Sequence, residues 1–432
     1  VAEGKLTVEE RNALIREVAD EVCSDVVRDN RLQSDALSLE MARPGMLIHH
    51  RWLIAELEST GLLSRALEAI PSERQLDQLA EAGAGLVRSQ LAVLLAYAKI
   101  DAYARVIESD APDSPALAPY LDRYFPAVIT DRFTEETRRH PLRREIIATA
   151  VINDCVNRHG VTFLHRVASE EGRSIGEVLR AWVRANSLVD GDGFFDAIDE
   201  THTTGALLPD DAIAARIAFA DSVEEIVRWI LLNDHQIDLD DERFRAVLLE
   251  ARAIQTGPSL ELEVTLPDPL ERALSDAVRM RAALECATLA QRHAVSARVA
   301  DIVLESAAER LFSFELAQEA RRVRVSTIED EVVRGRLLAR LDRLRLRLAS
   351  AILLGMSDDH QASPEARDRA ASIRPSETAV VDIPRRAREL VADDHPARRF
   401  VAARIARLPT SEPLTPSGLF VLVESLEHLL PR

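Results

Sequence analysis

A glycine pair near residue 85 is the first feature that could bind a cofactor. The segment EAGAGLVRSQ contains Gly83 and Gly85, which resemble the opening of a dinucleotide-binding loop. Arg88 stands where that loop needs its third Gly or Ala, and no strand is predicted before it. A phosphate cradle of this kind requires both features. We therefore predict no nucleotide site at this segment.

An acidic run with two glycines, from Asp190 to Asp196, is the second candidate. Its sequence, DGDGFFD, begins like a calcium-binding loop. Phe194 occupies a ligand position, however, and Phe195 takes the position at which such a loop needs glycine. We therefore interpret the run as a turn, in which the two glycines break the chain.

Two histidine pairs are candidates for metal ligation. His159 and His165 are six residues apart across a glycine, and His49 and His50 are adjacent. Neither spacing directs two imidazoles to one helix face, as ligands at i and i+4 would be. We therefore expect surface or capping histidines and no metal site.

Other catalytic motifs are also missing from the sequence. It contains no GxSxG turn for a serine nucleophile and no P-loop for phosphoryl transfer. Its 72 Asp and Glu residues are too many for any acid pair to be informative, and most are expected to solvate helix faces. We predict no catalytic, cofactor-binding or metal-binding residue in this chain.

One predicted helix, residues 143–158, combines an apolar face with many polar side chains. Its Ile, Ala and Val residues keep helical spacing, which predicts a central buried helix. The polar residues that flank this face are Arg143, Arg144, Asn153, Asp154, Asn157 and Arg158. Because buried polar groups must be paired, we expect an internal network. A surface that docks a neighbouring domain is the alternative, and catalysis is a distant third.

The elements that position these residues are predicted to be helices. Thr7 and Glu10 form a capping-box pattern before a helix that extends to Val27, and Ser174 caps a helix that ends near Ser187. Other segments with helical periodicity are 38–58, 89–106, 212–220, 222–232 and, with few breaks, 270–354. In the last of these, an apolar stripe is expected at three and four spacing, formed by Leu337, Leu341, Leu344 and Leu348. A linker is expected from Asp234 to Asp241.

The tail and one short segment depart from this pattern. Prolines are expected to divide the tail into short helices, of which the last covers 417–430. These prolines are Pro375, Pro384, Pro396, Pro409, Pro413 and Pro416. The segment ELEVTLPDP has the only strand-like alternation, with apolar residues at Leu262, Val264 and Leu266. A lone strand lacks hydrogen-bonding partners, so we interpret it as an extended linker.

Composition supports an all-α fold with several packed helical subdomains and little or no β-sheet. Hydrophobic residues make up 47% and charged residues 29%, while Gly numbers only 15 and aromatic residues 4%. This balance is typical of a folded globular chain with few strands. The net charge of −18 disfavours a nucleic-acid partner, because phosphate binding needs a basic face.

The cellular setting is predicted from cysteines, apolar stretches and the first residues. Cys23, Cys155 and Cys286 are far apart, which indicates reduced, buried thiols in a cytoplasmic protein. The most apolar stretch, 91–98, is far shorter than the roughly 20 residues of a membrane span. The first residues lack both an apolar leader and an initiator Met, so we expect a piece of a longer chain.

Several ordered blocks resemble a known family. They are VRSQLAVLLAYAKI (87–100), YLDRYFPAVITDRF (120–133) and HPLRREIIATAVINDCVNRHGVTFLHRV (140–167). These blocks are similar to the C-terminal region of the large bacterial NAD-specific glutamate dehydrogenases, and the segment 11–30 is similar to the stretch that follows their nucleotide-binding domain. The resemblance covers about residues 1–240. This chain has Val-Arg-Ser-Gln at 87–90 where the family has Thr-Arg-Pro-Glu, so we expect a different helix cap there.

The resemblance implies a role inside a larger enzyme. The parent enzyme would oxidise L-glutamate with NAD to 2-oxoglutarate, ammonium and NADH in amino-acid catabolism. Its NAD loop, catalytic residues and glutamate site would lie upstream, so no site residue is transferred to this chain. The segment would be inactive alone and would have a structural, assembly or regulatory role. Its partners would be the upstream catalytic domain and other subunits of a cytoplasmic homotetramer.

Four segments are expected under this hypothesis. Residues 1–60 follow the upstream nucleotide-binding domain, 61–205 hold the family blocks, 206–356 form long helices, and 357–432 form a tail of short helices.

Two alternatives differ in function. One is a stand-alone helical scaffold that binds a protein partner, and the other is an allosteric ligand site between helices, which leaves no motif.

Overall fold

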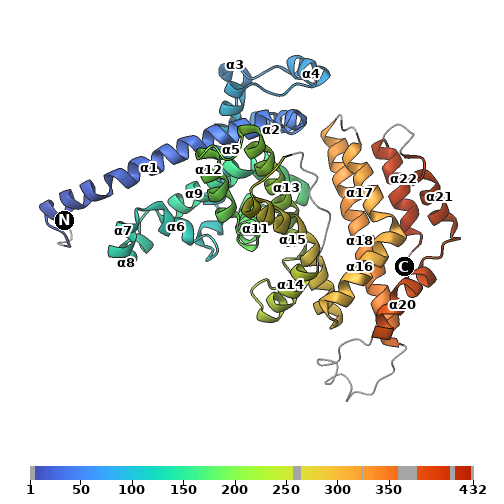
Figure 1. The fold of residues 1–432 in the computed structure, drawn as a ribbon. Helices are drawn as coiled ribbons and strands as arrows, with labels where there is room; N and C mark the ends of the chain where they lie inside the picture. The colour runs from blue at the N-terminus through green and yellow to red at the C-terminus, as the bar shows by residue number, and fades with distance from the viewer. Residues whose placement is uncertain are drawn as a thin grey trace. The chain divides into compact units, whose positions relative to one another are not determined.

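The computed structural model describes residues 5–255, 264–323, 325, 327–358, 377–408 and 414–429. Every regular element in these ranges is a helix, which confirms the all-α prediction (Figure 1). Two compact units are present, one formed by Val1–Asn233 with Leu260–Val278 and the other by Asp234–Ser259 with Arg279–Arg432. Within the described ranges, no helix combines the length and the apolar character needed to cross a membrane.

The first unit contains thirteen labelled α-helices and two short 3-10 turns in chain order. They are α1 (Val8–Met41), η1 (Pro44–Met46), α2 (Leu47–Ser59), α3 (Arg65–Glu68), α4 (Glu73–Glu81), α5 (Arg88–Ile107), η2 (Ala111–Asp113), α6 (Pro119–Tyr124), α7 (Ala127–Arg132), α8 (Thr134–Arg138), α9 (Arg143–His159), α10 (Phe163–Glu171), α11 (Ile175–Leu188), α12 (Gly191–Thr203) and α13 (Pro209–Asn233). The start of α15 (Asp268–His293) also belongs to this unit.

Helix α1 begins with the capping box that the sequence predicts. Thr7 Oγ1 accepts from the Glu10 amide at 3.1 Å, and Glu10 Oε2 accepts from the Thr7 amide at 2.8 Å. The helix is longer than expected, because it continues through Ser38, where we predicted a second helix to begin. No Gly or Pro interrupts residues 28–41, so nothing in this stretch ends the helix.

Helix α9 is the centre of the first unit, as predicted. It packs against α1, α5, α6, α10 and α13. Its buried apolar residues include Ile147, Val151 and Cys155, each no more than 1% exposed. Burial of a side chain of this size contributes about 1.5–3 kcal/mol, so this helix supplies much of the stability of the unit.

One prediction for the first unit needs correction, and the linker expected after it is confirmed. Helix α13 is a single helix where we expected two, at 212–220 and 222–232. Asp221 and Ser222 resemble a cap, but Ser222 Oγ donates to the Ala218 carbonyl inside the helix instead. The residues from Asp234 to Asp241 contain no helix, as expected of a linker.

The second unit contains the remaining helices. They are α14 (Glu242–Ile254), the rest of α15, α16 (Ala297–Leu311), α17 (Ser313–Arg322), α18 (Ile328–Asp358), α20 (Glu377–Leu390), α21 (Pro396–Ile405) and α22 (Pro416–Glu427). Helix α18 packs against α16, α17, α20 and α22. Its predicted apolar stripe is confirmed, because Leu337, Leu341, Leu344 and Leu348 are all buried.

The prolines of the tail have mixed outcomes. Pro396 and Pro416 occupy the first positions of α21 and α22, where the missing amide costs no intrahelical hydrogen bond. Pro384 does not separate two helices, because it lies within α20. Three of the prolines lie outside the described residues: Pro375, Pro409 and Pro413. The start of the ELEVTLPDP segment also lies outside them; residues 264–267 contain no strand, and 268–269 begin α15.

Candidate functional site

A buried carboxylate at the end of α1 connects three parts of the first unit. Glu40 Oε2 lies 2.8 Å from His50 Nε2 on α2, and Glu40 Oε1 accepts from the Val161 amide at 2.5 Å. The side chains of Glu40 and His50 are only 3% and 2% exposed. An ionised carboxylate can only accept, so His50 Nε2 carries the proton. We call Glu40, His50 and Val161 the Glu40 cluster.

The charge of the Glu40 cluster is set by two opposing effects. Burial alone raises the pKa of Glu40, because it disfavours the charged form. The hydrogen bonds from His50 and Val161 outweigh burial, so the pKa of Glu40 lies below its usual value. The carboxylate is therefore ionised at neutral pH, and each of its two oxygens accepts one hydrogen bond.

Gly160 makes the Glu40 cluster possible. It ends α9 with φ +92° and ψ 173°, a conformation that L side chains rarely adopt. A Cβ at this position would collide with Glu40 Oε1. The backbone therefore needs glycine both for its torsion angles and for the close approach of the carboxylate.

The imidazole of His159 is enclosed beside this cluster. Its ring lies 4.6 Å from the Phe163 ring and 5.9 Å, edge to face, from Trp182. Nε2 has no hydrogen-bond partner among the described residues. Burial lowers the pKa of His159 to about 3, so the ring is neutral at physiological pH.

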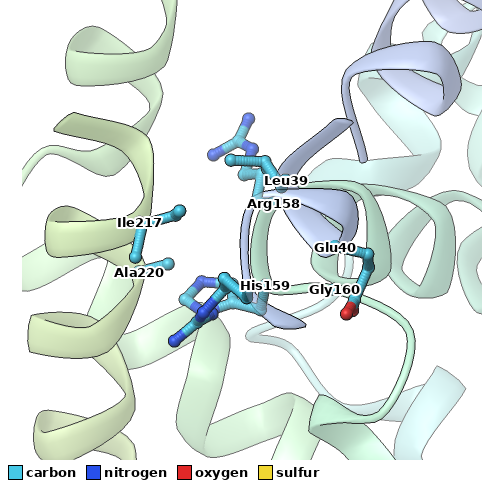
Figure 2. A pocket seen from close by; sticks show the side chains of 8 residues that line it. Leu39, Glu40, Arg158, His159, Gly160, Ile217 and Ala220 are labelled. Carbon is cyan, nitrogen blue, oxygen red and sulfur yellow. The ribbon is translucent and has the colours of Figure 1, made fainter. Parts of the chain in front are cut away.

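Glu40 and His159 border a small pocket (Figure 2). Its lining residues come from α1, α9, the turn after α9, and α13: Leu39, Glu40, Arg43, Arg158, His159, Gly160, Ile217 and Ala220. The cavity volume is about 10 Å³, barely enough for one water molecule, whereas sites for drug-sized ligands span roughly 300–1,000 Å³. Arg43 is already paired with Asp221, and Arg158 with two carboxylates. The pocket is therefore too small for a dinucleotide.

Arg158 is the centre of a second polar cluster on the same helix. It lies 2.6 Å from Asp154 within α9 and 2.6 Å from Asp192 at the start of α12. Asp154 also accepts from the Tyr120 hydroxyl at 2.8 Å, and the Arg158 guanidinium lies 4.8 Å from the Phe195 ring centroid. The cluster therefore ties α6, α9 and α12 together.

The acidic run that resembles a calcium loop contributes to this cluster and forms a helix start. We expected a turn, but only Asp190 is outside the helix, with φ +49°, and α12 begins at Gly191. Asp192 is engaged by Arg158, Arg123 and Asn186. Phe194 stacks on Phe219 of α13 with centroids 4.0 Å apart. The run therefore packs α12 against its neighbours.

The expectation of surface or capping histidines is wrong for both pairs. His49, His50, His159 and His165 are all less than 9% exposed. His165 Nε2 lies 2.9 Å from Asp101, which also pairs with Arg105 at 2.7 Å. His50 and His165 have their partners, Glu40 and Asp101, on other helices, a relationship that local spacing does not reveal.

A third buried cluster joins α10 to α13. Arg166 forms a two-pronged pair with Glu224, at 2.7 and 2.5 Å, and Arg228 binds the same carboxylate at 2.9 Å. Arg228 also contacts Glu170 and Glu171. Although burial opposes ionisation of Glu224, the two guanidiniums hold its pKa well below the usual value. This cluster is a closed arrangement of opposite charges.

The polar residues of α9 are confirmed as an internal network. Asn157 accepts from Lys99 at 2.9 Å, Arg144 donates to the Ile107 and Ser109 carbonyls, and Arg143 lies 2.5 Å from Asp113. With Asp154 and Arg158, five of the six predicted residues therefore have partners in this chain.

The glycine pair Gly83 and Gly85 lies in the connection between α4 and α5. Helix α4, not a strand, precedes it, and Arg88 donates to the Ser34 carbonyl at 2.9 Å, which fixes α5 to α1. Gln90 Oε1 accepts from the Val87 amide at 3.1 Å. The cap at 87–90 therefore uses glutamine in place of the family's acid.

The chemistry available to these clusters is ion pairing inside a helical core. Among the described residues, no group of three or more His, Cys, Asp or Glu is arranged to hold a metal ion.

The cysteines were all expected to be buried. Cys155 and Cys286 are buried, whereas Cys23 is exposed, which corrects its prediction. Glu40 was not singled out from the sequence, and no local pattern indicated that it lies against Gly160.

Comparison with known proteins identifies relatives of the chain. The family model described as glutamate dehydrogenase, C-terminal, matches residues 83–397. The NAD-specific glutamate dehydrogenase of Pseudomonas aeruginosa is 39% identical over 184 residues, which are 42% of this chain and 11% of the relative. The enzyme of the same name from Halomonas elongata is 37% identical over 187 residues, 43% of this chain and 12% of the relative.

A mycobacterial relative gives the same result. The NAD-specific glutamate dehydrogenase of Mycobacterium tuberculosis is 35% identical over 189 residues, 44% of this chain and 12% of the relative. The chain thus matches only about an eighth of the length of these curated relatives. Because the family model spans well over half of its residues, the chain belongs to the glutamate dehydrogenase C-terminal family.

Proposed function

We propose that this chain is the C-terminal helical region of a large NAD-specific glutamate dehydrogenase. The parent enzyme would oxidise L-glutamate with NAD to 2-oxoglutarate, ammonium and NADH, as part of amino-acid catabolism. In that enzyme this region would stabilise the catalytic portion and the assembly of subunits, while hydride transfer takes place elsewhere in the polypeptide.

The family match supports the first part of the proposal. The matching model describes a C-terminal region, and the three relatives are NAD-specific glutamate dehydrogenases by name. The chain corresponds to only 11–12% of their length. A region of this size would leave most of such a polypeptide to bind NAD and glutamate.

The Glu40 cluster is the observation that carries the structural role. Its carboxylate accepts from the imidazole and from the backbone amide inside the core, and the adjoining pocket is small and already lined by paired arginines. Hydride transfer needs a cradle that orients a cofactor against a substrate. Closed ion pairs between α1, α2, α9, α12 and α13 instead make the first unit rigid, which suits a stabilising region.

The proposed assembly is a cytoplasmic homotetramer in which this region contacts the catalytic portion of its own subunit. We also retain the segments 1–60, 61–205, 206–356 and 357–432 as proposed functional subdivisions. Limited proteolysis with mass spectrometry would test them, since cleavage is expected first near their boundaries.

Deletion tests the proposed role directly. The complete polypeptide is compared with a form that lacks residues 61–432, by sedimentation, thermal unfolding and glutamate-dependent NADH formation. We expect loss of the tetramer or a lower melting temperature. A deletion form with an unaltered tetramer, full activity and unchanged melting would disprove the proposal.

A genomic observation separates this function from a stand-alone scaffold. Codons directly before Val1 that encode a strand, a glycine-rich turn and a helix in the same reading frame would favour the enzyme region. A start codon at that place would favour the scaffold.

A further inference from the structure

The N-terminal half of α1 exposes a stripe of apolar side chains. Val8, Ile15, Val22 and Val26 are 47%, 57%, 43% and 55% exposed. The buried residue of this half is Leu14, on a different side of the helix. Large apolar side chains that are contiguous and exposed mark interaction surfaces more often than isolated ones do.

The stripe has the spacing of a helix-packing seam. Val8, Asn12, Ile15, Ala19, Val22 and Val26 are separated alternately by four and three residues, which is the heptad pattern of paired helices. We call these six residues the α1 seam. At 1.5 Å per residue the seam is about 27 Å long. A pattern maintained over three heptads indicates a partner along its whole length.

The other helices of the first unit contact a different side of this half. The Ala127 amide at the start of α7 donates to Glu21 at 3.1 Å, and Lys5 pairs with Glu136 of α8 at 2.7 Å. Figure 1 shows α6, α7 and α8 beside the blue helix α1 on one side. Glu21 lies near Leu14 on the helical wheel, about 140° from the centre of the seam.

The charge of this helix favours a basic partner over a second copy. Between Val8 and Asp29 there are seven acidic and three basic side chains, a net charge of −4. Two such helices placed side by side would repel each other within the Debye length of about 8 Å. An apolar face with Lys or Arg at its rim would instead be attracted.

The size of the seam favours a tethered partner. A strip about 27 Å long and about 10 Å wide covers roughly 270 Å², whereas a stable interface between free proteins buries about 800 Å² per partner. Covalent connection raises the effective concentration and removes the need for a large area. The chain matches only 11–12% of the length of its relatives. In a protein of that kind, most of the polypeptide would lie outside this match and could supply the partner surface for the seam.

We propose that the α1 seam docks on the remaining polypeptide of the parent enzyme, against an apolar face with basic residues at its rim. This inference rests on the proposed function and specifies where the C-terminal region contacts the catalytic portion. Ile15, Val22 and Val26 are its anchors, and the seam is covered only when the complete polypeptide is present.

Cys23 provides a reporter beside the seam. It is exposed and follows Val22 directly, whereas Cys155 and Cys286 are buried and serve as internal references. The test is to compare the rate of maleimide alkylation at Cys23 in the isolated chain with the rate in the complete polypeptide, both measured by peptide mass spectrometry. We expect fast labelling of the isolated chain and at least a tenfold slower rate in the complete polypeptide.

A matched pair of variants tests the anchors. Val22→Glu places a charge in the seam, while Val27→Glu makes the same change at a residue that is 68% exposed but lies outside it. Neither variant should alter the melting of the isolated chain. In the complete polypeptide, Val22→Glu should restore fast labelling of Cys23, and Val27→Glu should not.

Several results would overturn the inference. Equal labelling in both forms, or equal effects of the two variants, would show that the seam has no partner in the polypeptide. Slow labelling of the isolated chain would place the partner within this chain, and a Val22-dependent dimer of the isolated chain would identify a second copy. If the deletion of 61–432 still disturbs assembly, the proposed function stands while the seam inference falls.

Discussion

The carboxylate of Glu40 occupies the space in which a side chain at residue 160 would lie. Glu40 belongs to the end of α1 and Gly160 to the end of α9, and the two residues are 120 positions apart in the sequence. The Val161 amide donates to Glu40 at 2.5 Å. The junction of α1, α2 and α9 therefore depends on the absence of a side chain at residue 160.

Replacement of Gly160 by alanine should destabilise the first unit strongly. The substitution forces a side chain into φ +92° and displaces Glu40 from its hydrogen bonds. We expect a loss of about 3 kcal/mol or more, from roughly 1–3 kcal/mol of backbone strain and the broken contacts. Gly61→Ala is the control, since Gly61 has φ +74° in open space, and should cost only about 1–2 kcal/mol. Equal losses in urea unfolding would contradict this explanation.

Removal of the Glu40 carboxylate should be nearly as costly. Glu40→Ala leaves the His50 imidazole and the Val161 amide without their acceptor in the core. Removing one partner of a buried pair typically costs about 3–5 kcal/mol. Glu17→Ala, on an exposed part of the same helix, should change the free energy of unfolding by less than about 0.5 kcal/mol. Similar melting temperatures for the two variants would show that the Glu40 cluster is unimportant.

His159 should make stability depend on pH. Its pKa is about 3 in the folded chain and 6.5 in an unperturbed histidine. Between these values the unfolded chain binds a proton that the folded chain does not, so the free energy of unfolding falls as the pH decreases. The slope approaches about 1.4 kcal/mol per pH unit well below pH 6.5. The lowered pKa of Glu40 adds a loss in the same direction below about pH 4.5.

Two histidine variants isolate this effect. His159→Leu should reduce the difference in unfolding free energy between pH 7.5 and pH 5.5, measured with urea. His235→Gln, at a side chain that is 78% exposed, should leave the difference unchanged. An unaltered pH dependence in His159→Leu would mean that the imidazole is not held neutral by burial.

The acidic run at the start of α12 should not respond to calcium. Asp192 is occupied by Arg158 and Arg123, at 2.6 and 2.7 Å, so its oxygens are already neutralised. Millimolar Ca²⁺ should therefore leave the melting temperature unchanged, while Asp192→Asn should lower the stability by about 1–3 kcal/mol because it weakens partly buried charged hydrogen bonds. A calcium-dependent rise in melting temperature that Asp192→Asn abolishes would restore the calcium-loop hypothesis.

Local sequence patterns predicted the elements whose determinants are local. The Thr7–Glu10 capping box, the cap at Ser174 and the leucine stripe of α18 are all present, because each depends on residues within one or two helical turns. Helix α13 is one helix where two were predicted, and the Ser222 hydroxyl, which could have capped a second helix, bonds within the helix instead.

The interior clusters could be predicted only in part. The polar residues of α9 indicated a network because they flank an apolar face, but their partners were not identifiable. Glu40 lies 121 residues before Val161, and Asp101 lies 64 residues before His165. Pairings over such distances are fixed by the packing of helices, so a single sequence contains no local signal for them.

The proposed function requires that hydride transfer takes place outside this region. The isolated chain is therefore mixed with NAD and L-glutamate, while calorimetry follows binding and absorbance at the NADH band follows turnover; the complete polypeptide is the positive control. We predict no binding and no NADH from the isolated chain, and steady NADH formation from the complete polypeptide. NAD binding with glutamate-dependent NADH formation by the isolated chain would contradict the account.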